Sequence, residues 1–487
     1  MTISFNQIPS QLRVPLFYAE FDNTRANQGG ATQEYKTLLI GNKLSSGTKA
    51  QLTPQIVTSE EQAYEYFGVG SQIADAAASY LKNNRIHQLV CVAIDDLLAG
   101  VKAQGTVTIA GTPTEAGIMS FMIAGRNIKV GVTTSDTPTT LATALAAAIV
   151  ADTKNVVTAT SALGVVTWVM KNKGEFGKEV QMSHSYFTGE ALPAGVTVAF
   201  ATTVVGAGNP DVDDVWPVIG DQQYLLVLTP YLDSSSLDKV ETELADRFGP
   251  LRHNDGYGLY AKRETFANLI TLGDSRNSQF TTILGISGPT NPWVWAAAMA
   301  GQVAGSASID PARPFQTLPL VGIYAPLEAD RFDLTERNQF LYGGIATFKV
   351  ASGDAVLLEG VITTFKKNSF DAPDESYLYL NTPLTLSYLR FDFAATITSK
   401  YPRHKLANDG TRFAPGQAVV TPLVLKAEAV NKFREWEEKA LVEGFDQFKN
   451  DLIVERNSDN PNRVDILLPP DLVNQLVIVG TKIQFLL

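Results

Sequence analysis

Short apolar runs alternate with amphipathic segments over two stretches of the chain, residues 35–99 and 206–335. Short apolar runs bounded by polar residues or glycine are typical of buried strands, whereas apolar residues three and four positions apart indicate helices. Strands that alternate with helices predict a parallel α/β core. The expected strands are 35–40, 89–94, 224–228, 258–261 and 280–286, and the expected helices follow Ser59 and Asp233 and cover 264–272 and 293–306.

Residues 100–205 interrupt this core and differ from it in pattern. They are rich in threonine and poor in charged residues, and their apolar residues alternate with polar ones in short runs. Such runs are typical of strands that are buried on one side. Strands are expected at 107–109, 120–123, 128–132, 156–160 and 165–170, with one alanine-rich helix at 141–151. The pattern predicts a threonine-rich β-domain inserted into a discontinuous α/β core.

The last part of the chain, residues 336–474, has a third pattern. Three strand-like runs at 346–350, 356–358 and 361–365 are followed by a helix from Thr382 to about Tyr401. A second long helix is expected at 423–448, with Phe433, Leu441 and Phe448 on its apolar face. This order predicts a C-terminal α+β domain.

Both ends of the chain are apolar and lack a helical period. In the arm formed by residues 1–34, the residues Leu12, Val14, Leu16 and Tyr18 are too apolar for a free tail. In residues 475–487 one strand face carries Val477, Val479, Ile483 and Phe485, which predicts a half-buried terminal strand. The pattern leaves open whether each extended arm pairs with its own sheet or with that of a neighbouring molecule.

Composition narrows the possible classes of protein. The chain has 487 residues, 45% of them apolar, which indicates a folded multidomain protein. Its net charge of −11 argues against nucleic acid as a main partner, because phosphate binding needs a cationic face. The sequence has no apolar run long enough to cross a membrane and a single cysteine, Cys91, so we expect it to be made in a reducing cytoplasm.

Residue chemistry predicts no catalytic, cofactor or metal site. The four histidines lie far apart in the sequence, and no phosphate-binding loop or nucleophile elbow occurs. The acids at Asp211–Asp214 are expected to form a solvated turn, and Asp95 with Asp96 a polar domain junction. We expect Cys91 and Trp436 to be packing residues.

Several segments resemble the sheath proteins of Mu-like contractile bacteriophage tails. The opening FNQIPSQLRVPLFYAEFDNTRA is similar to theirs, as is the central DPARPFQTLPL at residues 310–320. So are LNTPL at 380–384, YPR at 401–403 and LANDG at 406–410. The likeness rests on the collinear order of these segments over nearly the whole chain.

The resemblance implies a structural subunit of the virion that is assembled in the host cytoplasm. Its partners would be further copies in stacked hexameric rings, a tail tube protein, and baseplate and tail terminator proteins. The apolar arms would add strands to the C-terminal sheath domains of neighbours. The helix at 423–448 would face the tube through Lys426, Lys432, Arg434 and Lys439, and the inserted β-domain would lie on the outer surface.

Two other interpretations remain open on the sequence. One is another tail or baseplate protein of a virion, which would not need both termini as detached strands. The other is an α/β hydrolase with an inserted β lid, which would need a pocket where two titratable groups converge.

Overall fold

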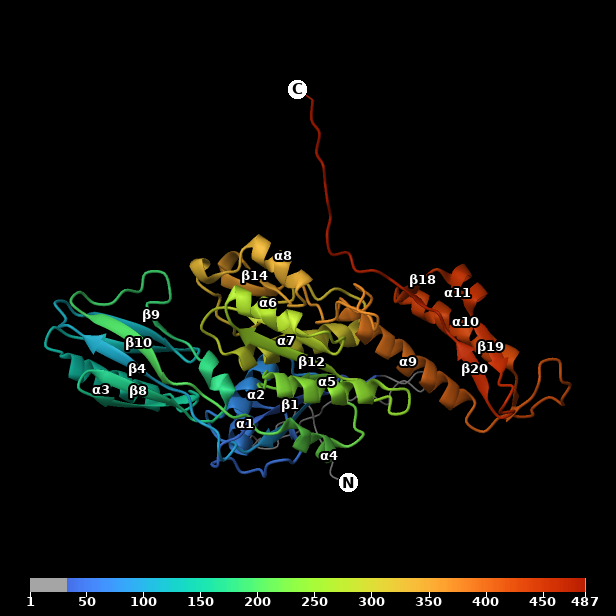
Figure 1. The fold of residues 1–487 in the computed structure, drawn as a ribbon, viewed down its shortest axis with the longest axis horizontal. Coiled ribbons are helices and arrows are strands. Elements are labelled where there is room, and N and C mark those ends of the chain that lie inside the picture. Colours follow the sequence, from blue (N-terminus) through green and yellow to red (C-terminus); the bar gives the residue numbers. More distant parts are fainter. Residues whose placement is uncertain (1–32, 487) are drawn as a thin grey trace, which may run out of the picture. The chain divides into compact units, whose positions relative to one another are not determined.

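The computed structural model describes residues 33–486, and the chain divides into two compact units (Figure 1). Among these residues, the first unit contains Tyr35–Gly305 and Phe315–Leu378. The second contains Ser306–Pro314 and the chain from Tyr379 onward. The structure thus mixes helices and sheets in more than one compact body, as expected.

A six-stranded sheet forms the centre of the first unit. Its order is β13-β12-β11-β1-β3-β2, and all neighbouring strands are parallel except β2, which pairs antiparallel with β3. The strands are β1 (Thr37–Asn42), β2 (Gln55–Val57), β3 (Leu89–Ile94), β11 (Leu226–Leu228), β12 (Tyr257–Arg263) and β13 (Thr281–Ile286). Every residue of β1, β3, β12 and β13 is buried, which explains why continuous apolar runs predicted them.

The helices of this core begin at side-chain caps that the sequence already indicated. Ser59 accepts a hydrogen bond from the Gln62 N–H, and Asp233 accepts one from the Ser236 N–H. The helices are α1 (Glu60–Phe67), α2 (Gln72–Asn83), α4 (Trp216–Ile219), α5 (Ser234–Phe248), α6 (Phe266–Asp274), α7 (Pro292–Ile309) and α8 (Leu334–Tyr342).

The inserted segment, residues 100–205, folds into two antiparallel sheets with one α-helix. One sheet has the order β10-β4-β8-β7 and the other β6-β5-β9. The elements are β4 (Gln104–Ala110), β5 (Gly117–Ile123), β6 (Arg126–Val132), α3 (Pro138–Ala151), β7 (Val157–Ala162), β8 (Val165–Met170), β9 (Met182–His184) and β10 (Thr197–Val204). The five predicted strands and the predicted helix are present, whereas β9 and β10 were not predicted.

Residues 336–378 differ from the expectation in grouping and in strand content. They group with the first unit rather than with the C-terminal one, since a bridge joins Ala346 to Leu284 of β13. The strands β14 (Phe348–Ala351) and β15 (Ala355–Leu358) pair as a hairpin. The third expected strand, 361–365, does not form, because Thr363 and Thr364 donate their N–H groups to two different segments, at Leu378 and Thr281.

The second unit is built on two long helices and several very short strands. Its elements are α9 (Asn381–Lys400), β16 (Lys405–Leu406), β17 (Val419–Val420), α10 (Pro422–Glu438), β18 (Val442–Glu443), α11 (Phe445–Asp451), β19 (Ile453–Arg456), β20 (Val464–Leu467) and β21 (Asp471–Leu472). The helix predicted at 423–448 is wrong in length. It ends at Glu438 because Ala440 (φ 54°) and Gly444 (φ 75°) adopt left-handed backbone conformations, and a separate helix follows.

Candidate functional site: the C-terminal unit and its tail

The apolar core of the second unit lies where α9, α10 and α11 meet. Phe433 of α10 stacks on Phe448 of α11, with ring centroids 4.0 Å apart and planes inclined by 20°. The buried cluster consists of Leu389, Ala429, Phe433, Trp436, Leu441, Val442, Phe448 and Leu452. Trp436 is therefore a core residue, as the sequence predicted.

A carboxylate of α9 is buried beside this core. Asp392 accepts a hydrogen bond from the Trp436 indole N–H at 2.7 Å, and it forms an ion pair with the Lys432 Nζ at 3.0 Å. Lys432 also reaches Glu435 at 2.6 Å. Burial alone would lower the pKa of Lys432, but hydrogen bonds to Glu435 and Asp392 outweigh it and raise that pKa. Asp392 was not singled out from the sequence.

The four cations predicted to face the tube lie in different surroundings. Lys432 is only 8% exposed and neutralises Asp392, so it is a structural residue. Arg434 pairs with Glu437 at 2.5 Å and lies over the Phe445 ring, and Lys439 reaches the Tyr388 hydroxyl at 2.7 Å. Lys426 is half-buried and has no ion-pair partner among residues 33–486. The structure thus leaves Lys426, Arg434 and Lys439 at the surface of the unit.

The small sheets of this unit are pairs of short strands. β18 pairs with β21, and β19 pairs with β20; all four strands have two to four residues. Within the described part of the chain, each of these strands has one neighbour and one open edge. Two-stranded pairs of this size are marginal by themselves, and a further strand would stabilise them.

The chain leaves β21 as an exposed, apolar segment. Val473 still donates its N–H to Leu441 at 3.2 Å, but residues 473–486 form no helix or strand, and Figure 1 draws them as a plain trace. Among residues 33–486 no strand pairs with this segment, so the predicted strand is not formed within the single chain, and its formation with a neighbour stays a prediction. Its four predicted pairing residues are solvent-exposed: Val477 by 38%, Val479 by 73%, Ile483 by 83% and Phe485 by 78%.

The other predicted arm cannot be compared in the same way. Leu12, Val14, Leu16 and Tyr18 lie outside the described residues. The pairing of both arms with neighbours stays a prediction.

Asp95 and Asp96 join the inserted segment to the core, as predicted. Asp96 accepts hydrogen bonds from the amides of Asn42 (2.8 Å) and Asn172 (2.9 Å) and from the Lys173 N–H (2.9 Å). Asp95 pairs with Lys43 at 3.4 Å. The carboxyl end of β3 is therefore joined to the inserted segment through polar contacts.

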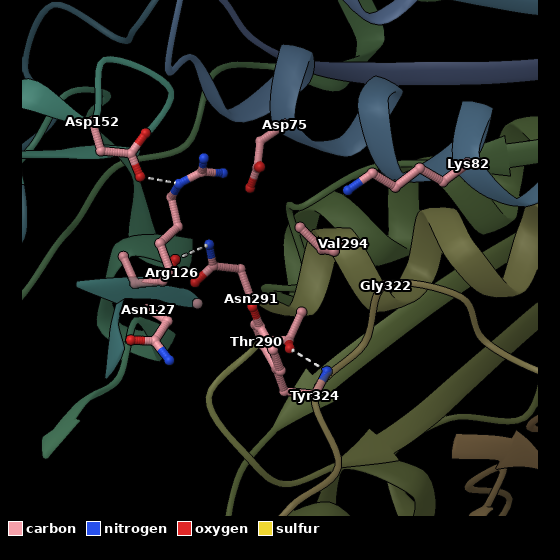
Figure 2. A pocket seen from close by; sticks show the side chains of 12 residues that line it. Asp75, Lys82, Arg126, Asn127, Asp152, Thr290, Asn291, Val294, Gly322 and Tyr324 are labelled. Atoms are coloured by element: carbon pink, nitrogen blue, oxygen red, sulfur yellow. Dashed lines mark hydrogen bonds and ion pairs between the residues drawn. The ribbon is translucent and has the colours of Figure 1, made fainter. Parts of the chain in front are cut away.

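A second junction encloses a polar pocket of about 330 Å³ (Figure 2). Arg126, the first residue of β6, donates to Asp152 at the end of α3 and points toward Asp75 of α2. Asp75 accepts a hydrogen bond from the Trp293 indole N–H at 2.7 Å, and burial raises its pKa. Two carboxyl groups thus converge here, as a hydrolase would require, but each is held by a donor. The arrangement ties the inserted segment to α2 and leaves neither acid unpaired.

The remaining predicted residues have structural surroundings. Cys91 is fully buried in β3. Asp211 pairs with Lys239 at 2.6 Å, and Asp213 pairs with the same lysine at 3.3 Å, which makes this a surface turn tied to α5. No group of three or more metal-ligating acids, histidines or cysteines occurs within residues 33–486. No helix in that part of the chain is long and apolar enough to cross a membrane.

Comparison with known proteins defines the class. Residues 205–364 match the central domain of phage tail sheath proteins, and residues 372–485 match the phage tail sheath C-terminal domain. Together the two matches cover more than half of the chain. The Mu-like prophage FluMu tail sheath protein of Haemophilus influenzae is 43% identical over 488 residues, which covers all of both chains.

Solved sheath structures are more distant. The sheath tail protein of Desulfitobacterium hafniense is 13% identical, with a TM-score of 0.49 over 95% of this chain and 97% of the other. That of Listeria innocua is 12% identical, with the same score over 91% and 93%. The helical sheath of the anti-feeding prophage in its contracted state is 11% identical, with a score of 0.49 over 97% and 99%.

The chain belongs to the phage tail sheath family. This assignment rests on the domain matches and on the full-length relative. Within the family, the chain is similar over its full length to a sheath protein of the Mu-like type.

Proposed function

We propose that this chain is the subunit of a contractile tail sheath with no catalytic role of its own. Copies stack as rings around a tail tube, join a baseplate at one end and a terminator at the other, and shorten to drive the tube through the host envelope. They assemble in the host cytoplasm and act in the virion. Residues 379–474 of the second unit serve as the assembly region, and the inserted β-domain lies on the outer surface.

The exposed tail carries this proposal. Residues 477–486 expose several large apolar side chains that no other described residue covers, although burial of such side chains stabilises a protein by about 1.5–3 kcal/mol each. A segment of this kind in a sheath protein fits a strand that is completed in the polymer. Strand addition supplies main-chain hydrogen bonds for affinity, and alternating side chains fix the register.

The tail and the N-terminal arm act as a pair in this scheme. Val477, Val479, Ile483 and Phe485 of the tail, and Leu12, Val14, Leu16 and Tyr18 of the arm, enter sheets of neighbouring subunits. Among the described residues of the second unit, the open edges of β16–β17, β18–β21 and β19–β20 could accept such a strand. Pro15 interrupts the arm, so it faces away from the ladder or marks a break in it.

Contraction needs a source of free energy within the polymer. The extended sheath is a kinetically trapped state, and release of the first ring lets subunits rotate as near-rigid bodies. If contraction buries about 200 Å² more apolar surface per subunit, it releases on the order of 5 kcal/mol per subunit at ~25 cal/mol per Å². Summed over many subunits, this suffices without a nucleotide.

The tube contact is made by surface cations of α10 and its end. Lys426, Arg434 and Lys439 remain candidates, because exposed charge pairs are weak enough to dock and to release. Lys432 belongs to the core ion pair instead and contributes through the position of α10.

The test is negative-stain microscopy of the purified protein beside a variant, I483E/F485E. The intact chain should form hollow cylinders, and the variant should remain as separate particles because two charges would enter a buried strand face. L251E is the matched control, since Leu251 is 96% exposed outside the tail, and it should assemble normally. Cylinders of normal length from I483E/F485E would refute the role of the tail, and uniform small particles from the concentrated intact protein would refute the sheath proposal.

A further inference from the structure

The four-stranded sheet of the inserted segment has two open edges. Its order is β10-β4-β8-β7, with antiparallel pairing throughout. Among residues 33–486, no strand pairs with the outer side of β10 or of β7. An open edge is a template for another strand, and proteins commonly block it with charged residues, proline or short length.

Neither edge is blocked by charge or proline. β10 has the sequence TVAFATTV and β7 the sequence VTATSA, so both are neutral and made of residues that favour strands. A bulge between Thr202 and Val204 leaves residues 197–202 of β10 in regular register. That regular stretch has the same length as β7, which spans six residues.

Hydrogen bonds within the sheet show which groups of β10 point outward. Ile109 of β4 donates its N–H to Gly164 at 2.9 Å, on the β8 side, so it does not bond to Val198 opposite it on β10. In an antiparallel pair, two residues opposite each other either both hydrogen-bond to each other or both point their backbone groups away, and the two kinds of pair alternate along the strand. Val198, Phe200 and Thr202 therefore direct their backbone N–H and C=O groups to the open side.

The same reasoning applies to β7. Met170 of β8 donates its N–H to Ala103 at 2.9 Å, on the β4 side, so Val157 opposite it points outward. Ala159 and Ser161 follow at alternate positions. The Val157 N–H is bound by the Asn155 side chain at 3.2 Å, which leaves the outward groups of Ala159 and Ser161 and the Val157 carbonyl for a partner.

The direction of the two edges fits a second copy of this chain as the occupant. Because the sheet has four antiparallel strands, β7 and β10 run in opposite directions. Two copies stacked in the same orientation would therefore bring β7 of one antiparallel to β10 of the other. A head-to-tail contact of this kind repeats without closing on itself, as a helical polymer requires.

We propose that β10 of one copy pairs with β7 of the next copy, so that the inserted domains form a continuous sheet between subunits. The partner is a second copy of this chain, and the contact is separate from the exchange of the termini. The proposal rests on the proposed sheath function, since it needs copies stacked in one orientation.

Disulfide crosslinking tests the contact in the full chain. Ala201 on β10 and Thr158 and Thr160 on β7 are exposed on the same face of the sheet, and the native Cys91 is buried. Oxidation of assembled A201C/T158C or A201C/T160C should give a ladder of covalent oligomers, because opposed cysteines of a strand pair lie within disulfide range. The matched control is A110C/T160C, since Ala110 is exposed on that face but belongs to the inner strand β4.

Each outcome separates the two proposals. Cylinders without a ladder in either pair would overturn the edge contact and leave the sheath function intact. A ladder in short oligomers without cylinders would keep the edge contact and overturn the sheath function. If neither cylinders nor a ladder form, both proposals are overturned. Covalent dimers from A201C alone would mean β10–β10 pairing and contradict the proposal. Adding Thr202→Pro to A201C/T160C removes an outward N–H and should abolish the ladder.

Discussion

The central sheet of the first unit and the small sheets of the second are built on opposite principles. In the first unit, β1 and β12 are buried along their whole length and lie between neighbouring strands on both sides. In the second unit, β18 to β21 are two to four residues long, and the chain beyond them exposes large apolar side chains. The central sheet of the first unit buries its inner strands within a single copy, whereas the second unit carries an apolar tail that no other described residue of the copy covers.

This difference has a consequence for stability. A sheet with strands on both sides of each central strand needs nothing more to fold. In the described part of the second unit, an apolar cluster and a buried ion pair around Asp392 instead hold the helices together. A single substitution there should therefore remove a large share of its stability and leave the first unit folded.

The largest effect is expected for Asp392→Ala. The change takes the acceptor from the Trp436 indole and leaves the buried Lys432 ammonium with Glu435 as its remaining partner, which should cost about 3 kcal/mol. Calorimetry should show the transition of the second unit lowered or lost, with the first unit unchanged. Asp392→Asn is the graded control, since it keeps an acceptor for Trp436 and should cost less. If the whole protein instead unfolds in one transition that shifts to a lower temperature, the two units are not separately stable.

A smaller effect is expected at the helix caps. Thr421 caps α10 through its hydroxyl, which accepts from the Val424 N–H at 3.4 Å, and Ser59 caps α1 in the same way at 3.2 Å. Replacement of either residue by alanine should cost about 1 kcal/mol. Because the second unit has less stability to lose, Thr421→Ala should abolish assembly at elevated temperature before Ser59→Ala does. Equal temperature limits for the two variants would argue that both units are equally stable.

The elements that the sequence predicted correctly are those that pack against other parts of the same chain. Strands β1 and β3 were predicted because burial on both faces makes most of their residues apolar. The helix expected at 423–448 was too long, because Leu441, Phe445 and Phe448 continue the apolar spacing through a turn that is set by Ala440 and Gly444. The pattern records which side chains are buried but not the local backbone conformation.

The candidate site was predicted less well for a related reason. Lys432 looked like a surface cation because its partner Asp392 lies forty positions earlier on another helix, which helical spacing cannot reveal. Alternation in the last thirteen residues identified a strand face, but whether that face is buried depends on a second molecule. β10 escaped prediction because it is mostly exposed and lacks a clear apolar face.

A pH-dependent effect is expected in the first unit, at Asp75. Burial raises the pKa of this carboxyl despite the Trp293 N–H and the nearby charges of Arg126 and Lys82, so the ionised form destabilises the folded state. The cost is absent below the ordinary aspartate pKa of about 3.9 and appears as the pH rises through the raised folded-state value. Asp75→Asn should therefore match the parent near pH 3.5 and melt at a slightly higher temperature at pH 7. Asp152→Asn, which loses its ion pair with Arg126, should not raise the melting temperature at pH 7. A lower melting temperature for Asp75→Asn at pH 7 would show that the ionised carboxylate stabilises the junction.

Removal of the C-terminal tail is expected to have the smallest effect on folding and the largest effect on assembly. Removal of residues 477–487 takes away Val477, Val479, Ile483 and Phe485, which lie in a segment without helix or strand. Because these side chains are exposed in the single copy, the free energy of unfolding should change by less than about 0.5 kcal/mol. The same truncation should prevent cylinder formation, since it removes the strand that a neighbour is proposed to receive. A marked loss of thermal stability in the truncated monomer would instead mean that the tail packs on its own unit, and the second unit would then be as self-sufficient as the first.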